Sequence, residues 1–235
     1  MGDLAGRELL DLWEGVGDLS PQRRALALAE AMGGESLGAR PVGVRDAWLL
    51  ALCAELSGPL LEAVASCPAC AEETEFTLDT PVLRKSAEQI VAQGAIELGD
   101  RRVAWRAPTG DDLVEIEVFQ DSEAAAAELL TRCLEGSVAL TEGERAAVAA
   151  AIAEADPLAE VLVELTCPSC DRAFSADVDV AEFAWRALQD AGRRLLGEVD
   201  ALARAYGWTE HEVLSLPDRR RATYLQLSAE GTGER

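Results

Sequence analysis

Apolar residues recur at helical spacing along most of this chain, and at strand spacing in only a few short stretches. The longest helical pattern covers 181–206, and shorter ones lie within 1–65 and 111–154. Several of them begin at a capping residue, as Thr109 does three positions before Asp112, and end at glycine or proline. The pattern predicts a mostly helical α+β protein.

Alternation of apolar and polar residues marks the predicted strands. Residues 75–79 and 175–179 alternate in the same way and lie 100 positions apart. Residues 159–165 are alternating and partly β-branched, which predicts another strand, whereas the stretch that begins at Pro59 is either helical or extended. Residues 95–106 predict a hairpin, because a Gly-Asp turn lies at their centre.

Two C-P-x-C motifs precede the matching strands 75–79 and 175–179. The first contains Cys67 and Cys70, and the second contains Cys167 and Cys170. A tight turn lets two cysteines that are two residues apart direct their sulfurs at one point, and proline pre-forms that turn. Two such turns supply the four thiolates of a structural zinc site. The sequence therefore predicts a Zn²⁺ ion shared by the two motifs, in a zinc-ribbon-like β unit.

Other interpretations of the cysteine motifs remain open at this point. The four cysteines can form two disulfides, act as redox C-x-x-C pairs, or represent a site that has lost its metal. If a metal is bound, four thiolates leave no open coordination position, so we expect a structural role and not a catalytic one.

The order of these segments predicts a single domain. The two motifs can share one ion only if the intervening residues fold out and return, which would close the domain at its middle through the metal. The predicted segments are N-terminal helices (1–65), two paired halves of the zinc unit (66–80 and 159–180), a mixed middle insertion (81–158), C-terminal helices (181–228) and a flexible tail (229–235).

Charge and composition narrow the function. The net charge is −22, which disfavours binding to nucleic acid or to an anionic membrane surface. We identify no signal peptide and no apolar stretch long enough to span a bilayer, so we expect a cytoplasmic protein. The remaining cysteines, Cys53 and Cys133, lie in apolar helical patterns and are expected to be small buried residues.

No motif for catalysis is present in the sequence. The single histidine, His211, lies at the start of a short predicted helix and has no orienting partner nearby in sequence. Nucleophile-elbow, zinc-protease and phosphate-loop motifs are missing. We therefore expect a protein that is not an enzyme and that has no small-molecule substrate.

A candidate surface for a partner protein lies near the C-terminal end. Aromatic and arginine side chains are enriched at protein interfaces, and they gather there in an otherwise acidic chain. An equally good interpretation is that these side chains pack against the long helix and that the arginines pair with surplus acid. The candidate residues are Tyr206, Trp208, Leu216, Arg219, Arg220, Arg221 and Tyr224.

Several of these segments, taken in order, resemble the T4-type baseplate hub assembly chaperone family of contractile phage tails and extracellular contractile injection systems. The resemblance spans nearly the full length and rests on Leu12-Trp13-Glu14, the Pro41-to-Leu50 segment, both C-P-x-C motifs, Ala203-to-Trp208, Ser215-Leu216-Pro217 and Arg219-Arg220-Arg221.

This resemblance implies a non-catalytic protein that helps to build the baseplate of a contractile apparatus, or remains in it. Its expected partners are baseplate hub or wedge proteins, and it can be carried in an assembled contractile particle. Two alternatives from other classes stay open: a zinc-ribbon adaptor of another cytoplasmic complex, and a thiol redox protein that uses its C-x-x-C pairs.

Overall fold

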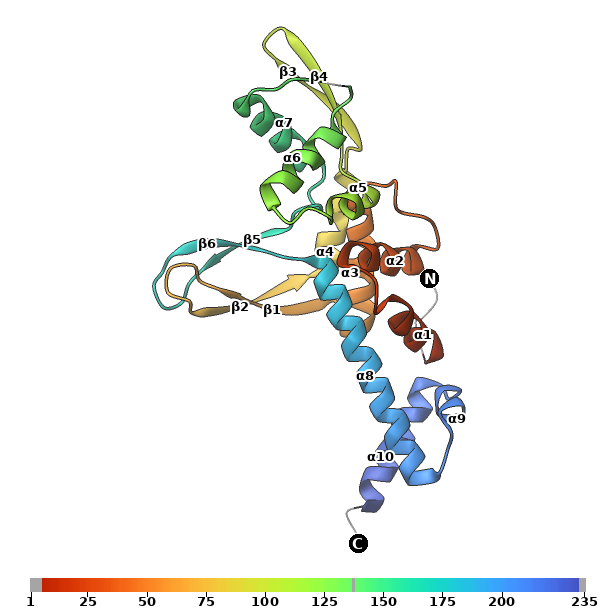
Figure 1. Ribbon diagram of the computed structural model, residues 1–235. Helices are drawn as coiled ribbons and strands as arrows, with labels where there is room; N and C mark the ends of the chain where they lie inside the picture. Colours follow the sequence, from red (N-terminus) through yellow and green to blue (C-terminus); the bar gives the residue numbers. More distant parts are fainter. Residues whose placement is uncertain (1–5, 137, 233–235) are drawn as a thin grey trace.

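The structure is a computed structural model that describes residues 6–136 and 138–232. Helices dominate, and the described strands pair into three separate antiparallel hairpins. The mostly helical α+β class predicted from the sequence is therefore confirmed. Figure 1 shows two paired hairpins that project to one side of a helical body, with a smaller helical layer on one side of them and a helical pair on the other.

The main core is formed by the N-terminal helices and the long helix α8. Residues such as Leu28, Leu49 and Leu188 are fully buried in it. The indole of Trp13 lies against Gly192 of α8, where a Cβ atom would come within 2.7 Å of the ring. The helices are α1 (Arg7–Val16), α2 (Pro21–Gly33), α3 (Val42–Ser57) and α8 (Val180–Tyr206).

Each cysteine motif connects the two strands of a hairpin. The first hairpin pairs β1 (Leu60–Ser66) with β2 (Glu73–Asp79), and the second pairs β5 (Leu162–Thr166) with β6 (Ala173–Asp177). The stretch after Pro59, which the sequence left as helical or extended, is thus a strand. The motifs lie at the tips of the two hairpins, which project from the middle of the molecule (Figure 1).

The two hairpins continue into helices in the same way. Asp79 accepts a hydrogen bond from the N–H of Val82, and Asp179 accepts one from Glu182, so each caps the helix that follows. With Asp179 as its cap, α8 begins at Val180, and β6 ends at Asp177, two residues before the end of the predicted strand 175–179. The two cysteine-bearing segments are therefore similar beyond the cysteines, because each also ends in an aspartate that caps the next helix.

The middle segment has a second core of its own. Val103, Trp105, Cys133, Val148 and Ile152 are buried together there. The segment contains α4 (Thr80–Lys85), a 3₁₀ turn (Ser86–Gln89), the hairpin β3 (Gln93–Leu98) and β4 (Arg101–Arg106), α5 (Gly110–Ile116), α6 (Ser122–Cys133) and α7 (Glu142–Ala155). The predicted hairpin at 95–106 is confirmed, with Gly99 at a positive φ of 61°.

Two buried or half-buried carboxylates join the middle segment to the N-terminal helices. Asp156 accepts a hydrogen bond of 2.8 Å from the N–H of Gly43, in the first turn of α3. Glu117 accepts hydrogen bonds from the Ser20 hydroxyl and the Gln22 N–H, in the first turn of α2. The N-cap residues of α2 and α3 make no side-chain hydrogen bond to the first turn of their helices. The two carboxylates therefore accept from backbone N–H groups that would otherwise lack a partner there.

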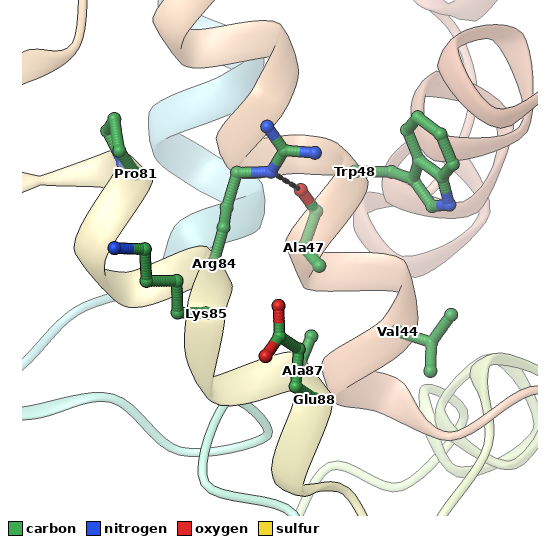
Figure 2. Close-up of a pocket in the computed structure, with 8 residues that line it drawn as sticks. All are labelled: Val44, Ala47, Trp48, Pro81, Arg84, Lys85, Ala87 and Glu88. Atoms are coloured by element: carbon green, nitrogen blue, oxygen red, sulfur yellow. Dashed lines mark hydrogen bonds between the residues drawn. The ribbon is translucent and has the colours of Figure 1, made fainter.

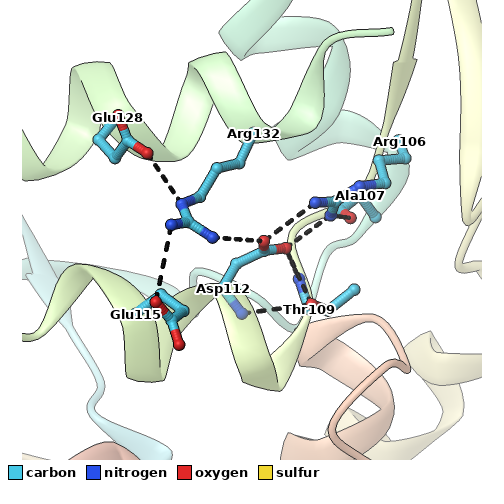
Figure 3. Close-up of polar contacts among 7 residues, drawn as sticks. All are labelled: Arg106, Ala107, Thr109, Asp112, Glu115, Glu128 and Arg132. Carbon is cyan, nitrogen blue, oxygen red and sulfur yellow. Dashed lines mark hydrogen bonds and ion pairs between the residues drawn. The ribbon is translucent and has the colours of Figure 1, made fainter.

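A network around Asp112 organises the middle segment internally (Figure 3). Arg106, at the end of β4, donates two hydrogen bonds to the buried Asp112 carboxylate, at 2.5 and 2.9 Å. Thr109 and Asp112 form a capping box at the start of α5. Arg132 of α6 lies 4.0 Å from the same carboxylate, so one aspartate connects three elements.

The C-terminal helices pack against the far end of α8. They are α9 (Glu210–Leu214) and α10 (Asp218–Thr232). Within the expected flexible tail at 229–235, α10 continues through Thr232, and 233–235 lie outside the described residues. Within the described residues, no helix is long and apolar enough to cross a bilayer.

The Asp112 network predicts a pH-dependent contribution to stability. Burial raises the pKa of Asp112, but the hydrogen bonds from Arg106 and Thr109 outweigh it and hold the pKa below its ordinary value of 3.8. The charged form therefore stabilises the fold at neutral pH, and this contribution disappears as the pH falls through the lowered pKa. Asp112→Asn should lower the free energy of unfolding by about 2 kcal/mol at pH 7. Chemical denaturation at pH 7 and at acid pH measures this; an equal loss at both pH values would contradict it.

Candidate metal centre

The two cysteine motifs adopt the same local turn. In the first, the N–H of Cys67 donates to the Glu72 carbonyl and the N–H of Ala71 donates to the Cys67 carbonyl, each at 2.9 Å. In the second, the same two hydrogen bonds measure 2.9 and 3.0 Å. Ala71 and Asp171 occupy the left-handed region, with φ of 61° and 55°. These turns bring both sulfurs of each motif to the end of its hairpin.

The four sulfurs of Cys67, Cys70, Cys167 and Cys170 meet at the hairpin tips. The Cys67–Cys170, Cys70–Cys167 and Cys70–Cys170 Sγ distances are 3.8, 3.6 and 3.6 Å, and all four sulfurs lie within 4.8 Å of one another. A tetrahedral zinc site with Zn–S bonds of about 2.3 Å has sulfurs about 3.8 Å apart. The donor set and its spacing therefore fit a metal ion, as the sequence predicted.

Disulfides are not part of this arrangement. All six cysteines are free, and the sulfur separations across the two motifs are far above the ~2.05 Å of an S–S bond. The four thiols also form a single cluster drawn from both hairpins, and not two independent pairs. This geometry favours a ligand shared by the motifs over two separate redox C-x-x-C sites.

The cluster has a buried side and an exposed side. Cys67 and Cys167 are buried with Phe174 and Ala176 in a small apolar cluster, whereas Cys70 and Cys170 are exposed. The apolar side chains shield the inner sulfurs from water, and the outer pair gives a metal a route from solvent. Four sulfur ligands would complete a tetrahedral shell, which suits a structural ion.

The turn also prepares the cluster electrostatically for a cation. The backbone N–H of Ala69 donates to the Cys67 sulfur and is the main reason that the pKa of this thiol is lowered to about 7. The N–H of Glu72 lowers the pKa of Cys70, but hydrogen bonds among the crowded sulfurs outweigh it and raise that pKa to about 12. The first thiolate thus forms easily, and further thiolates need a positive ion among them.

The two remaining cysteines lie elsewhere, as expected. Cys53 is buried in the main core and Cys133 in the second core. Burial raises the pKa of Cys53 to about 12 and that of Cys133 to about 11, so both thiols are protonated at neutral pH. The prediction that they are small buried residues is confirmed.

The aromatic residues of the proposed partner surface gather at the far end of α8. The Trp208 ring centroid lies 4.8 Å from those of both Tyr206 and Tyr224. Tyr206 is exposed, and the other two rings are half-buried. This cluster presents a partly exposed aromatic surface next to the start of α10.

The arginines predicted beside this aromatic cluster divide into two kinds. Arg219 and Arg220 are exposed on the first turn of α10, and Leu216 is half-buried. Arg221 is buried and donates to Glu198, Asp218 and the Leu216 carbonyl. Arg221 therefore fits the alternative interpretation, in which the arginines pair with surplus acid, because its guanidinium holds α10 against α8.

His211 is exposed on α9, and its backbone carbonyl accepts from Ser215. One pocket, between α3 and α4, carries two cationic side chains, Arg84 and Lys85, that the sequence analysis did not single out (Figure 2). Its only sequence signal was that Lys85 is the single lysine of the chain.

Removal of one inner sulfur tests the metal site. Cys67→Ser should release the metal and lower the melting temperature by roughly 10 °C, because the ion closes a long loop between distant parts of the chain. Cys53→Ala is the matched control, since it removes a buried thiol outside the cluster and should keep the metal. Metal analysis and calorimetry of both variants provide the measurement. Full metal content in Cys67→Ser would contradict the assignment.

The left-handed turn residues provide a second test. Glycine adopts a positive φ without the steric cost that an alanine side chain carries, so Ala71→Gly should stabilise the metal-loaded protein by about 1 kcal/mol. Gly143 has a free surface position in α7, and Gly143→Ala is a control for a general effect of glycine on the unfolded chain. Calorimetry measures both; a lower melting temperature for Ala71→Gly would show that the turn differs from the one described.

Comparison of the chain with models of known protein families, with curated proteins and with solved structures finds no match.

Proposed function

We propose that this chain is a non-catalytic assembly factor, or a minor structural component, of the baseplate of a phage-tail-like contractile injection system. In this proposal its four-cysteine cluster holds a structural Zn²⁺ ion, and its partners are hub or wedge proteins of the baseplate. The resemblance of ordered segments to the baseplate chaperone family supports the role in the baseplate. The protein acts in the cytoplasm, where particles of this kind assemble.

The observation that carries the proposal is the meeting of four thiols from two hairpins. Four sulfur ligands leave an ion no free coordination position for a substrate. The ion would therefore have a structural role and would fix the two hairpins relative to each other. Zinc is the metal that best suits a closed set of four cysteine thiolates. A scaffold with rigid projecting hairpins suits a protein that binds other proteins.

The aromatic cluster of Tyr206, Trp208 and Tyr224 supports a partner surface at the C-terminal end of α8, away from the cysteine cluster. Tyr206 is 39% exposed although large apolar rings pack beside it, and Arg219 and Arg220 are exposed next to it. Side chains of these types provide much of the binding energy in protein interfaces. The charge of this part of the chain also favours a partner surface, because it is nearly neutral. Residues 181–235 carry 8 Arg against 9 Asp and Glu, while the rest of the chain holds nearly all of the net charge of −22.

Particle assembly in the native host tests the proposal. Deletion of the gene should abolish or sharply reduce sheathed particles, and the wild-type gene should restore them. A gene that encodes Trp208→Ser and Arg219→Ser should fail to restore them, although this variant keeps its metal. A matched variant with Arg186→Ser and Arg193→Ser, on the exposed side of α8, should restore assembly. Electron microscopy of lysates measures the particles; normal assembly without the gene would contradict the proposal.

A further inference from the structure

A groove lies between α3 and the segment formed by α4 and the following 3₁₀ turn (Figure 2). Its volume is about 520 Å³, within the range of pockets that hold a few side chains or a small ligand. Its apolar lining is formed by Val44, Ala47, Trp48, Pro81 and Ala87. The groove therefore offers an apolar surface large enough for one bulky side chain and its neighbours.

Arg84 is held in place beside this apolar surface. Its Nε donates a hydrogen bond of 3.0 Å to the Ala47 carbonyl, which fixes the guanidinium across the groove (Figure 2). Among residues 6–136 and 138–232, no carboxylate forms an ion pair with Arg84 or with the exposed Lys85. Both terminal nitrogens of Arg84 thus remain available for bidentate binding of a carboxylate.

The charges at this groove differ from those of the molecule as a whole. Acidic residues outnumber Lys and Arg by 43 to 21 in the chain, whereas Arg84 and Lys85 give the groove an excess of positive charge over its one acid, Glu88. Glu88 is exposed and lies on the turn that closes the groove. It can accept a hydrogen bond from a backbone N–H, and it repels a second carboxylate, so a ligand would enter in one orientation.

We propose that this groove binds a segment of a partner protein in which an aspartate or glutamate stands next to a large apolar side chain. The carboxylate pairs with Arg84 and Lys85, and the apolar side chain covers Val44, Ala47 and Trp48. Charge complementarity selects this occupant, because a basic segment would be repelled by the two cations and a purely apolar one would leave them desolvated and unpaired. This proposal does not rest on the role in a baseplate, because it is argued from the residues of the groove alone.

An array of short immobilised peptides tests the groove directly. Each peptide has glycine and serine flanks around a central pair, and the array contains every ordered pair of amino acids. The full-length, metal-loaded protein should bind best to pairs that combine Asp or Glu with Leu, Phe, Met or Trp. Selected peptides are then measured in solution by fluorescence anisotropy. Replacement of their acidic residue by its amide should weaken binding roughly tenfold, as expected for the loss of one charge-assisted pair.

Variants of the protein show whether the binding occurs at this groove. Arg84→Glu with Lys85→Glu should abolish the preference for acidic–apolar pairs, and Val44→Ser should weaken binding while it leaves the charge preference intact. Arg193→Glu with Arg194→Glu is the matched control, since it reverses two neighbouring exposed cations on α8 and should bind as the wild type does. Melting temperatures confirm that each variant is folded. A preference for basic or uncharged pairs, no selective binding, or undiminished binding by the Arg84 and Lys85 variant would overturn the proposal.

Discussion

The structure depends above all on the meeting of four cysteine sulfurs from two hairpins that lie 100 residues apart in the chain. Without a positive ion, the crowded sulfurs disfavour further thiolates, as the pKa of Cys70, raised to about 12, indicates. If an ion is bound, the closely spaced sulfurs can all coordinate it, and the ion then joins the tips of both hairpins. A cross-link across a loop of this length removes about 5 kcal/mol of conformational freedom from the unfolded chain. One small centre can therefore account for much of the stability of the fold.

The bases of the hairpins are held by different means. Apolar side chains such as Leu61, Leu78 and Val161 join the main core, while Asp156 and Glu117 connect the middle segment to the starts of α3 and α2. The helical body thus places the hairpins side by side, and an ion held by the four cysteines would fix their tips. The groove beside Arg84 and the aromatic cluster at the end of α8 are formed by other residues than the cysteine cluster.

Local patterns in the sequence were enough to predict many elements and the cysteine cluster. The capping box at Thr109, the Gly99 turn and the spacing of the cysteines act over a few residues, so they can be recognised without the fold. Long-range features could not be predicted in this way. Arg221 looks like its exposed neighbours in the sequence, and only the packing of α10 on α8 buries it against Glu198. The strand at 60–66 was ambiguous because a short apolar run suits helix and strand equally.

The central claim is that one ion binds sulfurs from both hairpins of a single chain. X-ray absorption spectroscopy of the purified, monomeric protein tests this most directly, since it counts the ligand atoms around the metal and measures their distance. We predict one zinc ion per chain, surrounded by four sulfur atoms at about 2.3 Å. A zinc site with two sulfurs and the remaining positions filled by nitrogen or oxygen, or a monomer that holds no metal after expression with zinc, would contradict the account.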